Sequence, residues 1–75
     1  MRTLTTMDAY LITIWYKNTD GTRTQTHWTD HGRHGFNEAI ETIAWDFKNH
    51  GAISATIDRF LPHGQGTVEV YSRRA

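Results

Sequence analysis

The residues best suited to chemistry are three histidines, His27, His31 and His34, which lie within one short segment. Imidazole nitrogens ligate zinc and nickel, and a neutral imidazole can act as a general base near neutral pH. The spacing matches no metal motif, and structural zinc sites generally use four ligands, whereas no fourth ligand is evident here. A His-dependent metal-binding enzyme is therefore less expected than the two binding functions described below, and we assign no residue as a metal ligand.

Other groups that could support catalysis are sparse. The chain has no cysteine, which excludes disulfides and thiolate metal sites. Ser54 and Ser72 fall in predicted strands, without the strand-to-helix turn that exposes a nucleophilic serine. The glycines at positions 64 and 66 precede no predicted helix, so they do not form a phosphate-binding loop. We therefore expect neither enzymatic activity nor a cofactor.

Size and charge narrow the choice of partner. The 75 residues correspond to one domain, in which we expect residues 1–7 to be flexible. Eight basic and eight acidic side chains cancel, so no overall field attracts nucleic acid or anionic lipid. No apolar run approaches the roughly 18 residues of a membrane span, and the first residues lack the apolar core of a secretion signal. We expect a cytoplasmic protein without a membrane partner. Formation of a homodimer would stabilise so small a protein, because it would bury more apolar surface.

Four segments have the composition or alternation of β-strands: residues 9–16, 22–28, 52–60 and 67–73. The first two form a predicted hairpin, in which a three-residue loop with a left-handed glycine pairs Ile12 with Trp28 and Ile14 with Thr26. That register places the apolar side chains on one face, whereas a two-residue loop would scatter them. In the last two strands we expect the inward side chains to be Ile53, Ala55, Ile57, Val68 and Val70.

Residues 36–50 have the periodicity of an amphipathic helix. Its predicted apolar stripe consists of Phe36, Ile40, Ile43, Ala44 and Phe47. A loop over residues 29–35 precedes it, with Gly35 as the expected N-cap. The order β-β-α-β-β predicts a single α+β domain, in which a four-stranded antiparallel sheet carries one helix on one face.

Trp45 projects from the predicted helix on the side opposite the apolar stripe, among acidic residues. An indole at that position contributes nothing to the predicted core. Together with Glu38, Glu41 and Asp46 it forms an acidic-aromatic patch, which predicts binding to a basic protein surface.

The sheet face that the helix leaves uncovered is the second candidate surface. Its predicted binding residues are Trp15, Arg23, His27, Tyr71 and Arg73, and aromatic and arginine side chains are enriched at interface hot spots. Aromatic rings there could stack on bases while arginines contact phosphates, so the alternative function is a small nucleic-acid-binding module. The balanced charge makes nucleic acid a less expected partner than protein.

The chain resembles the small orphan proteins of phages and mobile elements that act as anti-CRISPR inhibitors. The resemblance rests on size and element order, in the strand segments DAYLITIWY, TRTQTHW, AISATIDRF and GTVEVYS and the helix FNEAIETIAWDFKNHG. It implies a non-catalytic inhibitor that binds a bacterial protein or ribonucleoprotein complex in the host cytoplasm and blocks it sterically. It assigns no functional residue.

Overall fold

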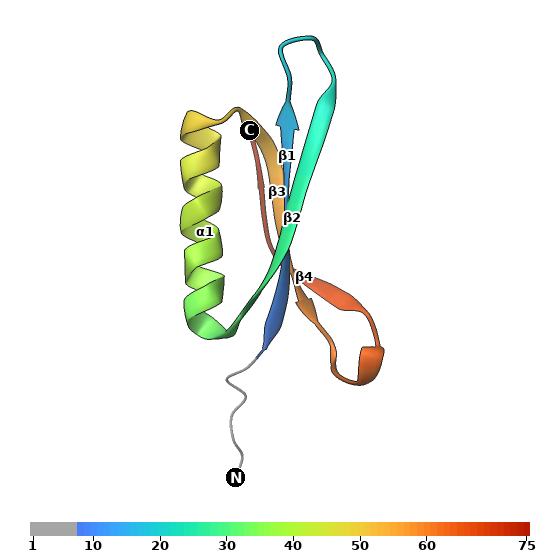
Figure 1. The fold of residues 1–75 in the computed structure, drawn as a ribbon. Coiled ribbons are helices and arrows are strands. Elements are labelled where there is room, and N and C mark those ends of the chain that lie inside the picture. Colours follow the sequence, from blue (N-terminus) through green and yellow to red (C-terminus); the bar gives the residue numbers. More distant parts are fainter. Residues whose placement is uncertain (1–7) are drawn as a thin grey trace.

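Helix α1 lies against one face of an antiparallel sheet in the computed structural model, which describes residues 8–75 (Figure 1). The elements in chain order are β1 (Ala9–Lys17), β2 (Arg23–His31), α1 (Gly32–Asn49), β3 (Ala52–Phe60), the short 3-10 helix η1 (Pro62–Gly64) and β4 (Thr67–Arg74). The strands are ordered β2-β1-β3-β4. The predicted α+β fold and its element order are confirmed, whereas the flexibility predicted for residues 1–7 concerns residues outside those described.

The β1–β2 hairpin has the predicted register, with Ile12 opposite Trp28 and Ile14 opposite Thr26. Gly21 adopts the left-handed conformation that a three-residue loop requires, at φ +89°. The Asp20 carboxylate accepts hydrogen bonds from the Thr22 hydroxyl at 2.6 Å and from the Thr22 backbone N–H at 2.9 Å. These bonds hold the pKa of Asp20 below its usual value, and the bond from the Thr22 hydroxyl has the larger effect.

The predicted loop over residues 29–35 is wrong. Strand β2 continues through His31, and the helix begins at Gly32, whose backbone N–H donates to the Asp8 carbonyl at 2.8 Å. Gly35 is therefore not the N-cap but a buried residue inside the helix. A Cβ at Gly35 would lie 2.8 Å from Asp30 Oδ1, so the absent side chain lets the start of α1 approach β2 closely.

The core lies between α1 and the sheet. Its buried hydrophobic residues are Ile12, Ile14, Ala39, Ile43, Ala52, Ala55 and Ile57. Phe36, Ile40 and Phe47 pack against this core as predicted and are partly buried, but Ala44 is exposed. The buried helix positions are Gly35, Ala39, Ile43 and Asp46. The buried side of the helix therefore includes Gly35, Ala39 and Asp46, which the predicted stripe left out.

An irregularity in the β1–β3 pairing changes which side chain of β3 faces the core. Trp15 pairs with Ser54, but the next residue, Tyr16, pairs with Ala52, so Ile53 is an extra residue. Because side chains alternate along a strand, one extra residue reverses the faces beyond it. Ala52 is consequently buried, and Ile53, which was predicted to face inward, is only partly buried.

A second irregularity lies between β3 and β4. Ile57 pairs with Tyr71 and Asp58 pairs with Glu69, which leaves Val70 as the extra residue. The predicted inward positions of Val68 and Val70 are wrong, since both side chains are exposed. The β3–β4 hairpin also extends away from α1, so the helix does not cover this part of the sheet (Figure 1).

Candidate functional site

An open groove of about 730 Å³ runs between α1 and β2. Its walls are formed by Glu38, Ala39, Glu41, Thr42 and Trp45 of the helix, and by Trp28 and Asp30 of the strand. The polar helix residues are three or four positions apart and therefore share one side of α1. Trp28 and Asp30 alternate along β2 onto the face that the helix covers, as the pairing of Trp28 with Ile12 requires.

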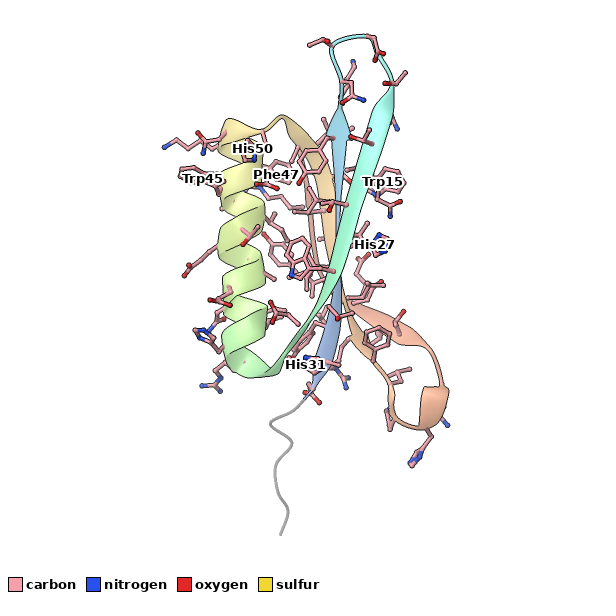
Figure 2. All side chains as sticks on the ribbon, in the orientation of Figure 1. Trp15, His27, His31, Trp45, Phe47 and His50 are labelled. Atoms are coloured by element: carbon pink, nitrogen blue, oxygen red, sulfur yellow. The ribbon has the colours of Figure 1, made fainter. Side chains whose placement is uncertain are left out.

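Trp45 is the most exposed large hydrophobic side chain of residues 8–75, with 60% of its surface accessible. Figure 2 shows its indole on the outer side of α1, whereas Phe47, two residues later, points between the helix and the sheet. The prediction that this indole lies outside the core is confirmed. A binding partner can bury an indole at this position, as partners usually do with tryptophans at protein interfaces.

The groove is acidic. Asp30, Glu38 and Glu41 contribute three carboxylates, and no lysine or arginine lines it. His34 adjoins the groove, with its Nε2 3.3 Å from Glu38 Oε2 across one turn of the helix. The groove therefore presents negative charge and an indole side by side near neutral pH.

Asp46 does not belong to this surface, and its predicted role in binding is corrected. Its side chain is only 11% exposed and points toward the sheet side of the helix. The Tyr16 hydroxyl donates to Asp46 Oδ2, and His50 Nδ1 lies 3.0 Å from Asp46 Oδ1. Burial, together with the hydrogen bond to this carboxylate, raises the pKa of Tyr16 to about 12. Asp46 thus anchors the end of α1 to β1.

Sequence reasoning could have found part of this arrangement. Asp46 continues the spacing of Ala39 and Ile43, which places it on the buried side of the helix. Asp30 was missed as a groove residue because β2 was predicted to end at residue 28, whereas Trp28 was predicted on the face that the helix covers but not as part of a groove. A longer β2 would have placed the side chain of Asp30 beneath the helix as well.

The side chains on the open face of the sheet form three rows, each of which crosses all four strands. The first row consists of Gln25, Trp15, Ser54 and Arg74. The second consists of His27, Thr13, Thr56 and Ser72. The third consists of Thr29, Leu11, Asp58 and Glu69. The face therefore changes along the strands from a basic, aromatic end, through hydroxyl groups, to an acidic end.

Three of the five residues predicted for this face lie on it. Trp15 and His27 point away from α1 in Figure 2, and Arg23 shares their side by alternation along β2. Tyr71 instead packs against the core, and the Arg73 guanidinium carbon lies 4.5 Å from the centroid of the Phe47 ring, beneath the helix. The extra residue in β4 causes both errors, because it reverses the alternation that had placed these side chains outside.

The three histidines singled out in the sequence do not come together. His27 and His31 share one face of β2 but are four residues apart, or about 13 Å along a strand. His34 lies in the first turns of α1, beside Glu38. Within residues 8–75, no group of three or more His, Cys, Asp or Glu side chains converges in a way that could hold a metal ion.

Comparison with known protein families, curated proteins and solved structures finds no match for this chain. The helices formed by residues 8–75 lack the length and apolar character needed to cross a membrane.

Proposed function

We propose that this protein is a non-catalytic binding module that holds a basic segment of another protein in the groove between α1 and β2. The observation that supports the proposal is the exposed indole of Trp45 at the rim of a groove with three carboxylates and no cation. Tryptophan is among the residues most enriched in interface hot spots. An isolated domain gains nothing by exposing most of an indole, whereas a partner that covers it gains its burial.

The charge of the groove specifies the chemistry of the partner. Asp30 and Glu38 stand on opposite walls, so a lysine or arginine side chain entering between them meets carboxylates from both elements. Such complementarity accelerates encounter and selects against acidic partners more than it adds affinity. The aliphatic stem of a lysine or arginine would pack on the indole of Trp45, with its charge directed at the carboxylates.

The resemblance to anti-CRISPR inhibitors indicates which partners to test first. CRISPR effector complexes hold nucleic acid in positively charged channels, which an acidic-aromatic surface complements. We propose that the protein acts in the cytoplasm of a bacterial host, where it occupies such a surface and blocks it sterically.

The test compares variants that leave the fold intact. Trp45→Ala and the pair Glu38→Gln with Glu41→Gln remove the two parts of the surface, while Phe60→Ala and Glu69→Gln remove an exposed aromatic ring and a carboxylate elsewhere. Two readouts are measured: binding to arrayed peptides that range from basic to acidic, and target-DNA binding by purified CRISPR effector complexes.

We expect binding to basic peptides that Trp45→Ala weakens at least about tenfold, as for a hot-spot residue, with a melting temperature within a few degrees of wild type. The two control variants should bind normally. Equal binding by Trp45→Ala and wild type, or a preference for acidic peptides, would refute the proposed function. Peptide binding without any effect on the effector complexes would refute only the inhibitor version of it.

A further inference from the structure

A second pocket, of about 370 Å³, lies on the opposite side of the sheet at the basic end of the open face. It is lined by Trp15, Arg23, Ile53, Ser54, Arg74 and Ala75. The extra residue Ile53 forms part of its wall, and the backbone N–H of Ala75 donates to the Ile53 carbonyl at 3.0 Å. The irregular pairing of β3 therefore places Ile53 in the wall of a pocket beside the indole of Trp15.

Two arginines, Arg23 and Arg74, line this pocket. Arg74 stands in the same row as Trp15, and Arg23 comes from the edge strand β2. The ion pairs formed within residues 8–75 are those of His34 with Glu38 and of His50 with Asp46, so neither arginine has a carboxylate within 4.0 Å among the described residues.

The pairing of β1 with β2 adds a third cation at an unfavourable position. Lys17 stands directly opposite Arg23 in the hairpin. Like charges directly opposite one another destabilise a strand pair, because their side chains are only about 5 Å apart at Cβ. An anion bound at Arg23 would offset this repulsion.

The other groups at the pocket match a flat, polar ring next to that anion. Trp15 is 38% exposed, so one part of its indole is free for stacking. Ser54 and Gln25 flank it in the same row and offer a hydroxyl and an amide, which can both donate and accept hydrogen bonds. Guanidinium groups bind phosphate oxygens in pairs, and an indole stacks on any nucleobase.

We propose that this pocket binds a nucleoside phosphate, with its base on Trp15 and its phosphate between Arg23 and Arg74. The opposite end of the open face limits the length of the ligand. Asp58 and Glu69 lie two rows away, or about 13 Å along the strands, and would repel the phosphates of an extended chain. The proposal is independent of the groove between α1 and β2, which lies on the other face of the sheet.

The experiment is a titration of the ¹⁵N-labelled protein followed by NMR. The three tryptophans give separate indole N–H signals, and Trp15→Phe identifies that of Trp15. The probes are adenosine 5′-monophosphate, adenosine, inorganic phosphate and a short oligodeoxyadenylate. The variants are Arg23→Gln, Arg74→Gln, both together, and Arg33→Gln as a matched charge removal on the exposed surface of α1.

Millimolar adenosine monophosphate should shift the Trp15 signal and leave those of Trp28 and Trp45 in place. Each arginine change should weaken binding about three- to fivefold, as for an exposed ion pair, and the double change about tenfold or more. Arg33→Gln should bind normally, and adenosine or phosphate alone should bind at least about tenfold more weakly, since each lacks one half of the contacts.

The oligonucleotide distinguishes the two sources of this chemistry. Weaker binding of the oligonucleotide supports a free nucleotide as the ligand, equal affinity supports the end of a single strand, and affinity that rises with length would refute the limit set by Asp58 and Glu69. The proposal is wrong if the Trp15 signal does not move, if adenosine moves it equally well, or if the double arginine variant binds as tightly as wild type.

Discussion

The contact between Tyr16 and Asp46 should contribute a large share of the stability of the fold. It joins two residues 30 positions apart and connects the last turns of α1 to β1. Asp46→Ala removes the acceptor of the Tyr16 hydroxyl and of the His50 ring N–H together. Hydrogen bonds to charged groups contribute about 1.5–3 kcal/mol, and a stranded buried donor costs about 1–3 kcal/mol.

We therefore expect Asp46→Ala to lower the free energy of unfolding by about 2–3 kcal/mol, since Tyr16 is partly buried and water can satisfy part of its hydrogen bonding. A chain of 75 residues has a total stability of only about 4–11 kcal/mol. The loss should lower the melting temperature by roughly 8–24 °C. Tyr16→Phe, which keeps the ring but removes the hydroxyl, should cost about 1–2 kcal/mol.

The measurement is urea unfolding of wild type, the two single variants and the double variant, followed by circular dichroism. The double-mutant cycle isolates the energy of the pair, which we expect to be about 1–2 kcal/mol. His50→Gln serves as the control for the second contact of Asp46, and it should cost less than about 1 kcal/mol because the imidazole is largely exposed. Additive costs in the cycle would show that the two side chains contribute to stability independently and would refute the reasoning.

Two further predictions concern the same layer of the molecule. Because the pKa of Tyr16 is about 12 in the folded protein and about 10 in an unfolded chain, its contribution is fully present below pH 10 and is lost as pH rises to 12. That loss is at most about 2.7 kcal/mol, and roughly 1–2 kcal/mol after allowance for partial exposure. Urea unfolding measured between pH 10 and pH 12 should show this loss of stability in wild type but not in Tyr16→Phe. Equal losses in both proteins would contradict the assignment of the raised pKa to Tyr16. Gly35→Ala should destabilise the protein by about 1 kcal/mol despite the better helix propensity of alanine, because its Cβ meets Asp30. The same change in an Asp30→Gly background, which also removes the Cβ that would lie 3.1 Å away, should be neutral or stabilising relative to that background, and destabilisation there too would place the clash elsewhere.

The features that could be predicted are those that depend on regular spacing. The β1–β2 register follows from the loop and from the need to place Ile12 and Ile14 on one face with Trp28, and the structure has that register. The exposure of Trp45 follows from helical periodicity alone. In both cases a single period, set by the backbone, fixes the direction of every side chain in the element.

The features that could not be predicted are breaks in that spacing. Nothing in the residues around Ile53 or Val70 indicates that one strand contains an extra residue relative to its neighbour. A bulge depends on the partner strand and on the helix packed above it, so it is a property of the assembled sheet. Beyond Val70, the error placed Tyr71 and Arg73 on the wrong face.

Both extra residues also shape the candidate anion pocket. The one at Ile53 supplies part of the wall beside Trp15. The one at Val70 reverses β4, so that Arg73 stacks on Phe47 while Arg74 takes the exposed place in the row of Trp15. With regular pairing beyond Glu69, Arg73 would take that place opposite Ser54, and Arg74 would face the helix side. The irregular pairings therefore place a basic, aromatic pocket on one face of the sheet and leave the acidic groove of Trp45 on the other. Because the two surfaces differ in charge and share no residue, a ligand at one leaves the other accessible, and variants of each can be tested without disturbing its counterpart.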